Sequence, residues 1–191
     1  MALTPSTMIP LGTVAPDFAL PDPSGRMVSL NDFPNARAYL IIFMCNHCPY
    51  VKHVRPLLAE LGRECQNQGV AMIGINSNTI VTHPQDSPEM MAREIQEAGY
   101  VFPYLFDESQ EVAKAYRAAC TPDPYLFDRN RKLVYRGQLD GSRPGNGIPL
   151  TGEDIRAAIE AVLKGQPVSP DQKPSIGCNI KWKPGNEPDY A

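Results

Sequence analysis

Residues 38–53 read AYLIIFMCNHCPYVKH, and this stretch indicates the fold. Its first seven residues form a continuous apolar run, which is typical of a strand buried on both faces of a sheet. Cys45 and Cys48 follow directly, separated by two residues, with His47 between them and Pro49 after them. The stretch therefore places a cysteine pair at the end of a buried strand.

Strands and helices alternate in the rest of the chain. After the cysteines, apolar residues recur at spacings of three and four, which predicts a helix with one apolar face. The predicted strands cover residues 38–44, 70–76, 104–107, 125–128 and 132–137, and the predicted helices cover 49–67, 87–98, 107–117 and 151–164.

This order predicts an α/β fold, a three-layer α/β/α sandwich around a mixed central β-sheet. Right-handed crossovers would place helices on both faces of the sheet. The strands at 125–128 and 132–137 are expected to be antiparallel neighbours around a short turn. The cysteine pair then lies at the carboxyl end of a central strand, where open α/β sheets place their chemistry.

A chain of 191 residues suits one domain with its own core. We expect this domain to span residues 1–166. Residues 167–191 hold five of the 20 prolines, which predicts an irregular C-terminal tail. The tail also carries Trp182, so we expect it to pack on the same domain.

The charge and hydropathy of the chain bear on its partners and its location. The net charge is −3, and basic residues are scattered, which argues against a nucleic-acid surface. No stretch approaches the roughly 18 apolar residues that span a bilayer. The N-terminus MALTPSTMIPLG lacks the charge and apolar run of a signal peptide. We therefore expect a cytoplasmic protein with no membrane partner.

The chain has five irregularly spaced cysteines, an odd number that does not suit a secreted disulfide scaffold. In a reducing compartment, a close pair is a redox couple, a metal site or two structural thiols. A C-x-x-C motif between a buried strand and a helix favours redox chemistry.

We expect Cys45 to be the reactive member of the pair. The thiolate is the reactive form, and unpaired N–H groups at a helix N-terminus favour an anion. A protonated His47 would add positive charge beside it. These features predict that Cys45 is an accessible nucleophile and that Cys48 resolves the mixed disulfide.

Several segments resemble the thioredoxin superfamily, specifically its peroxiredoxin-like branch, the AhpC/TSA group. They are GTVAPDF at residues 12–18, GRMVSL at 25–30, the C-x-x-C motif and Thr121-Pro122, and the likeness covers about residues 12–165. The resemblance implies a thioredoxin-like fold, catalysis by Cys45 and Cys48 without a bound cofactor or metal, and a His47 that stabilises the thiolate. It also implies a cis bond before Pro122 and a Thr121 backbone offered to an extended substrate.

The resemblance leaves a second reading open, a thiol peroxidase in which Cys48 attacks peroxide and Cys45 resolves. Here the sequence departs from the peroxidase pattern: Ile41 and Cys45 stand where that branch has Pro and Thr, and loop 119–124 has no Arg. Without such donors, charge on the peroxide oxygen is poorly stabilised. Tyr39 also stands where thioredoxins have a buried acid.

The remaining cysteines and His53 leave further alternatives. Cys120, beside the expected cis proline, is either a third redox thiol or a small buried side chain. Cys178 in the tail is either a mobile resolving thiol or a packed one, and Cys65 is expected in the core. His53 is either a helix-surface side chain or a ligand of a non-enzymatic metal carrier.

Together these observations predict a thiol–disulfide oxidoreductase. Its substrates would be disulfides of proteins or small molecules. The sequence does not identify its electron donor.

Overall fold

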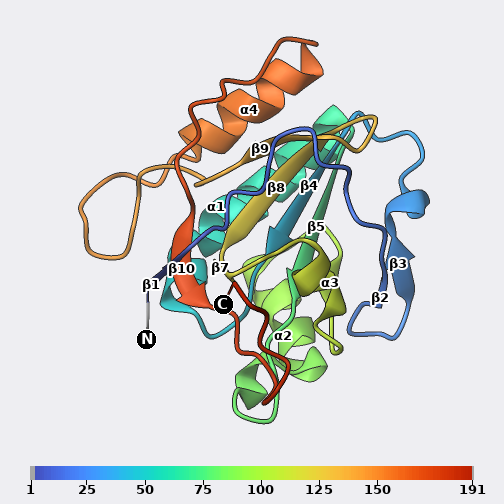
Figure 1. The fold of residues 1–191 in the computed structure, drawn as a ribbon, viewed down its shortest axis with the longest axis vertical. Helices are drawn as coiled ribbons and strands as arrows, with labels where there is room; N and C mark the ends of the chain where they lie inside the picture. The colour runs from blue at the N-terminus through green and yellow to red at the C-terminus, as the bar shows by residue number, and fades with distance from the viewer. Residues whose placement is uncertain (1–2, 191) are drawn as a thin grey trace.

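The structure, a computed structural model, describes residues 3–190. Its centre is a five-stranded sheet in the order β6-β5-β4-β8-β9 (Figure 1). β4, β5 and β6 are parallel, whereas β8 and β9 run antiparallel to their neighbours, so the predicted mixed sheet is confirmed. The strands are β4 (Ala38–Phe43), β5 (Val70–Asn76), β6 (Tyr104–Phe106), β8 (Asp123–Asp128) and β9 (Leu133–Arg136).

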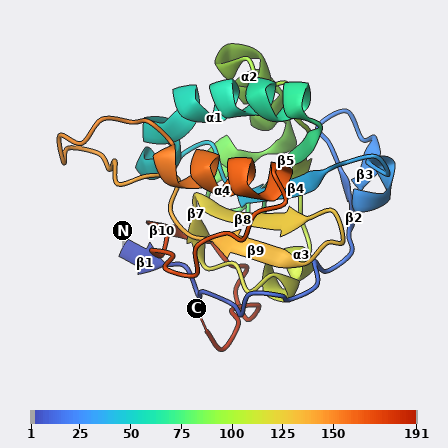
Figure 2. The same ribbon diagram turned by 90° about the horizontal axis from the view of Figure 1, so that it is seen from above.

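Three helices cover one face of this sheet (Figure 2). They are α1 (Pro49–Gln68), α2 (Pro88–Ala98) and α4 (Glu153–Leu163). The predicted apolar face of α1 is buried, and the helix ends at Gly69, whose φ of 74° is left-handed. Ser87 caps α2 as predicted, because its side chain accepts the N–H of Met90.

The opposite face is covered by α3 (Glu111–Ala115) and by the N-terminal segment (Figure 2). That segment contains the hairpin of β2 (Ala19–Pro21) and β3 (Met27–Ser29), followed by the short helix η1 (Leu30–Asp32). Both faces are thus covered, and the predicted three-layer architecture is confirmed.

The helix predicted over residues 107–117 is much shorter than expected, because α3 covers five residues. Gln110 and Arg117, which flank it, have positive φ angles of 66° and 51°. Asp107 is buried and its carboxylate accepts the N–H of Ala113 and the hydroxyl of Ser77. The Asp107 side chain thus accepts the N–H of Ala113, which in a longer helix would donate to a backbone carbonyl.

A second, three-stranded sheet in the order β1-β10-β7 lies at one end of the molecule (Figures 1 and 2). Its strands are β1 (Leu3–Pro5), β7 (Cys120–Thr121) and β10 (Ile176–Asn179). The tail was expected to be irregular, but β10 lies within it. The sequence IGCN has little strand propensity of its own, and its two neighbours supply the pairing.

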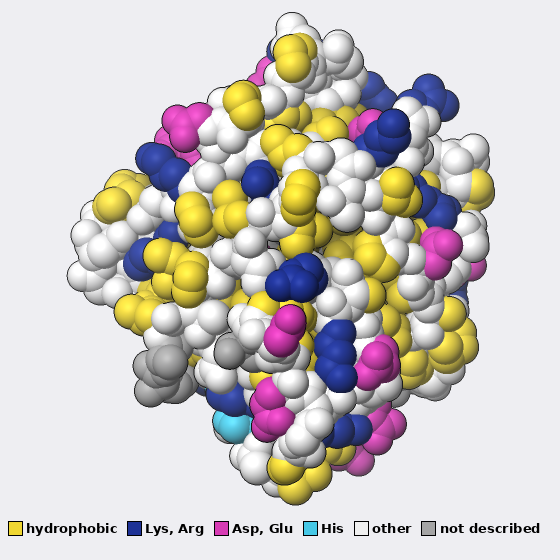
Figure 3. Space-filling model, viewed as in Figure 1, with side chains coloured by type: hydrophobic (Ala, Val, Ile, Leu, Met, Phe, Trp, Pro, Cys, Tyr) yellow, Lys and Arg dark blue, Asp and Glu magenta, His cyan; other side chains and the backbone are white. Residues whose placement is uncertain are grey.

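The surface in Figure 3 mixes charges of both signs, so this face carries no uniformly basic patch. Over the described residues, each helix is too short or too polar to cross a lipid bilayer. The short helix η2 (Pro84–Asp86) precedes α2 and completes the described elements.

Candidate active site

The cysteine pair lies where the chain leaves β4 and enters α1. Cys45 follows the end of β4 by two residues, and Cys48 is the N-cap residue of α1. Pro49 is the first helical residue, where its missing N–H costs no helix hydrogen bond. The pair therefore sits at the carboxyl end of a central strand, as predicted.

Thr121 contacts both thiols from the facing loop. Its hydroxyl lies 3.4 Å from Cys45 Sγ, and its carbonyl oxygen lies 3.3 Å from Cys48 Sγ. The Thr121–Pro122 bond is cis, so that prediction is confirmed. The structure thus brings together four of the predicted site residues, Cys45, Cys48, Thr121 and Pro122.

Cys48 is the more acidic thiol of the pair. The hydrogen bond from Cys45 lowers the pKa of Cys48 most, and bonds from the thiol and the backbone of Cys178 and from the N–H of Val51 lower it further. Burial opposes this shift, yet the pKa falls to about 4. The protonated form of Cys48 donates one hydrogen bond to Thr121 O, whereas the thiolate accepts several hydrogen bonds, and this difference favours the thiolate.

The pKa of Cys45 is shifted in the opposite direction. Burial, followed by its bond to Cys48 and the charge of Asp86, raises the pKa of the Cys45 thiol well above its usual value. Its exposed fraction is 1%. The prediction that Cys45 is accessible is therefore wrong, because its side chain is sealed from solvent. Its role as the nucleophile stays a prediction, which its burial and the nearby charge of Asp86 disfavour.

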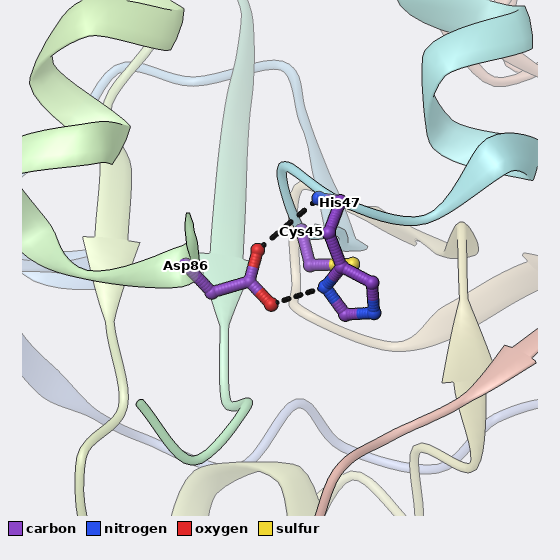
Figure 4. Close-up of side chains that lie close together, drawn as sticks. All are labelled: Cys45, His47 and Asp86. Atoms are coloured by element: carbon purple, nitrogen blue, oxygen red, sulfur yellow. Dashed lines mark hydrogen bonds and ion pairs between the residues drawn. The ribbon is translucent and has the colours of Figure 1, made fainter. Parts of the chain in front are cut away.

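That acid, Asp86 of η2, holds the loop between the cysteines (Figure 4). Its carboxylate accepts the backbone N–H groups of Asn46 at 2.8 Å and His47 at 3.2 Å. It also lies 2.5 Å from His47 Nδ1 and accepts the amide of Asn78. Burial favours the neutral acid, but the bonds from His47 and Asn78 outweigh it and lower the pKa of Asp86.

Cys45, His47 and Asp86 each offer one possible metal-ligand atom, and these atoms lie within 4.8 Å of one another. This is a different donor set from the one considered for a metal carrier, since His53 is instead bonded to Ser142 Oγ at 2.8 Å. We assign no metal to this cluster, because Asp86 and His47 are already bonded to each other.

The tail strand β10 lies over the pair. Cys178 is paired antiparallel with Thr121, and its thiol is hydrogen-bonded to Cys48. Cys48 has an exposed fraction of 0% and Cys178 of 3%. Cys48 is therefore sealed from solvent, and β10 is one of the segments packed against it.

Two further cysteines and Arg143 are placed as follows. Cys120 is buried on β7 and pairs with Asn179; burial raises its pKa well above the usual value. Arg143 lines the small cleft at Pro122, but its guanidinium donates to Gln138, Asp140 and Ser142. Cys65 lies on the buried face of α1 and belongs to the core, as expected.

Sequence reasoning missed the roles of Asp86 and Asp123. Asp123 follows the cis proline, is fully buried, and accepts the hydroxyl of Tyr125 at 2.9 Å. Burial raises the pKa of Asp123 to about 7. Neither acid lies in a recognisable motif; only the position of Asp123 beside the expected cis proline could have singled it out.

The family model described as the AhpC/TSA family matches residues 11–136. The chain belongs to the AhpC/TSA family.

Relatives and solved structures agree with this assignment. The chain is 28% identical over 159 residues to "Thiol-disulfide oxidoreductase ResA" of Geobacillus thermodenitrificans (strain NG80-2), covering 83% of this chain and 82% of that protein. It is 57% identical to an uncharacterized conserved protein from Geobacillus kaustophilus whose crystal structure matches with a TM-score of 0.94, covering 97% and 98% of the two chains.

A more distant structure supports the fold. It is a protein from Chlorobium tepidum, provisionally assigned as the thiol:disulfide interchange protein DsbE, with a TM-score of 0.64 and 22% identity, covering 81% of this chain and 98% of that one. The predicted thioredoxin-like fold and the predicted class of enzyme, a thiol–disulfide oxidoreductase, are confirmed.

Proposed function

We propose that this oxidoreductase uses Cys48 as its nucleophile and Cys45 as the resolving thiol, the reverse of the order expected from the sequence. The observation that carries the proposal is the position of Cys48 at the N-terminus of α1, where its sulfur accepts the N–H of Val51 and the thiol of Cys45. Helix N-termini stabilise anions in this way.

The exchange proceeds in two balanced steps. The Cys48 thiolate attacks one sulfur of a substrate disulfide, a mixed disulfide forms, and the other substrate sulfur leaves as a thiolate. Cys45 then loses its proton to the departing thiolate and attacks the Cys48 sulfur. The Cys45–Cys48 disulfide forms, and the substrate leaves with both of its sulfurs reduced.

The surrounding residues would position this chemistry. Asp86 fixes the loop that carries Asn46 and His47, so the distance between the two sulfurs is held by a buried carboxylate. Thr121 holds the two thiols against one residue of the facing loop. Both act as positioning residues, while Cys45 and Cys48 exchange bonds.

Protein thiols and disulfides are the substrate class that the enzyme class implies. We propose that an extended segment of such a protein binds at the backbone of Thr121 once β10 has left it, since a strand edge beside the thiols would fix the direction of the segment. Small disulfides that need no strand pairing would react as well. The electron donor would be another dithiol protein, and the cytoplasmic location stays a prediction.

Cysteine variants test the order of the two thiols. In Cys45→Ser combined with Cys178→Ser, Cys48 attacks but neither neighbouring thiol can resolve it, so mixed disulfides with an oxidised test protein should accumulate on Cys48. Cys48→Ser should form none, because burial and the charge of Asp86, which this variant retains, still raise the pKa of Cys45. Cys65→Ala, in the core and away from the pair, serves as the matched control. Trapping on Cys45 in Cys48→Ser would contradict the proposed order.

Cys48 is also the thiol that the peroxidase alternative requires, so the oxidant must be compared directly. Loop 119–124 offers no guanidinium to a peroxide oxygen. Hydrogen peroxide should therefore oxidise Cys48 much more slowly than a protein disulfide does at equal concentration. A faster reaction with peroxide would favour the peroxidase.

A further inference from the structure

Strand β10 occupies the backbone edge that the sequence predicted for an extended substrate. Cys178 is paired antiparallel with Thr121, the residue before the cis proline, and Asn179 is paired with Cys120. β1 holds the outer edge of β10 (Figure 1). The substrate edge is thus filled by a segment of the same chain, in the way that strand addition fills it with another protein.

The fit of this segment is close. A Cβ atom at Gly177 would lie 1.9 Å from the carbonyl oxygen of Thr121, so the strand can approach this far only with a glycine there. Ser175 donates its hydroxyl to Pro122 O at 2.6 Å, and Ile180 donates its N–H to Ala119 O at 3.0 Å. The segment is therefore fastened on both sides of Cys178.

The strand places a third thiol against the nucleophile. The Cys178 side chain and its backbone N–H both bond to the Cys48 sulfur. Burial, followed by the bond to Cys48 and its charge, raises the pKa of Cys178 to about 12. The contribution of Cys48 to this shift disappears once Cys48 is in a mixed disulfide, because its sulfur is then uncharged.

We propose that Cys178 is a third redox thiol, which forms a disulfide with Cys48 when β10 returns to Thr121. The inference rests on the proposed role of Cys48. After β10 lifts and Cys48 captures a substrate sulfur, the Cys178 sulfur attacks Cys48. The Cys48–Cys178 bond forms, the substrate thiolate leaves, and the proton of Cys178 passes to it. The substrate disulfide is the oxidant, so no further co-reactant is needed.

The product of this step is a closed, oxidised form of the protein. Cys45 can then attack Cys48, which releases the Cys178 thiol and moves the disulfide to the Cys45–Cys48 pair. Strand β10 would thus release the bound substrate, and its disulfide with Cys48 would then be exchanged for the Cys45–Cys48 disulfide. We do not assign this role to Cys120, because the hydrogen bond to the Cys48 sulfur from outside the C-x-x-C motif comes from the thiol of Cys178.

Dithiobis(nitrobenzoate), an aromatic disulfide that releases one coloured thiolate per exchange, tests this step. Cys45→Ser should release two coloured thiolates per molecule, and peptide mapping should find a Cys48–Cys178 disulfide. Cys45→Ser with Cys178→Ser should release one and retain the aromatic group on Cys48. The matched control, Cys45→Ser with Cys120→Ser, should again release two.

The outcomes separate this inference from the proposed function. If both Cys45→Ser and its Cys178→Ser derivative retain the aromatic group on Cys48, the third thiol is overturned and Cys48 remains the nucleophile. If Cys48 reacts in none of the variants, both the inference and the proposed function are wrong. A Cys48–Cys120 disulfide in place of Cys48–Cys178 would also overturn the inference.

Discussion

The carboxylate of Asp86 lies 2.5 Å from the imidazole Nδ1 of His47, and the same carboxylate accepts two backbone N–H groups of the loop between the cysteines. Asp86 belongs to η2, about forty residues further along the chain, and is fully buried. The spacing of Cys45 and Cys48 is therefore held by a charge from a distant segment.

Replacing Asp86 with Ala should destabilise the protein and disturb the pair. Removing this buried carboxylate leaves two backbone N–H groups and an imidazole without an acceptor, which should lower the free energy of unfolding by about 2–4 kcal/mol. Urea unfolding measures the loss, and the reduction potential of the Cys45–Cys48 couple measures the disturbance. Asp171→Asn, at an exposed position, is the control. Equal stability and potential in Asp86→Ala would contradict the positioning role.

The acidity of Cys48 gives a pH prediction. A thiol with a pKa of about 4 is ionised across the neutral range, so the reduced protein should show one thiolate by ultraviolet absorbance at about pH 6. Cys48→Ser should lose this signal. Cys45→Ala should retain it only at higher pH, because alanine removes the bond from residue 45, which is the largest cause of the lowered pKa of Cys48. A signal unchanged in Cys48→Ser would assign the thiolate elsewhere.

Gly177→Val should displace β10 from Thr121. The added side chain would overlap the Thr121 carbonyl oxygen, so the strand cannot lie in its observed position. Cys48, now fully covered, should then be alkylated at least about tenfold faster, since each 1.4 kcal/mol of lost docking free energy gives a factor of ten. Gly141→Ala is the control, because a Cβ there meets Ile148 at 3.8 Å, an ordinary contact. An unchanged rate would mean that β10 does not limit access.

Asp123 should make stability depend on pH. Its pKa is about 7 in the folded protein, above the value of about 4 in an unfolded chain. A carboxyl whose pKa is raised by folding stabilises the protein fully below about pH 4. This stabilisation is lost as the pH rises towards 7, by at most about 1.4 kcal/mol per pH unit. Asp123→Asn should flatten this part of the stability–pH profile, measured by urea unfolding. Asp171→Asn should leave the slope unchanged.

The centre of the sheet was predictable because β4 and β5 are buried, mostly apolar runs and the long helices are amphipathic. Strand β5 matches the predicted residues 70–76 in full. Helix α2 was marked by the Ser-Pro-Glu start that caps it. By contrast, β7 and β10 are too short to show a period, and they exist because they pair with each other.

The site was predictable in its motif and not in its electrostatics. The C-x-x-C pair and the cis proline carry local signals that a sequence shows. Which thiol ionises depends on where α1 begins and on Asp86 and Cys178, both of which reach the pair from distant parts of the chain. Spacing within a motif does not reveal such contacts.

The complete cover over Cys48 has a consequence for how its reactivity is measured. If the proposed lifting of β10 is what exposes this sulfur, a reagent in solution meets it only in the molecules whose β10 is detached at that moment. The observed modification rate is then the intrinsic rate multiplied by that fraction, as amide exchange is governed by local opening. The rate of alkylation would therefore report how often β10 is detached, and the rate of exchange would depend on that detachment as well as on the pKa of Cys48.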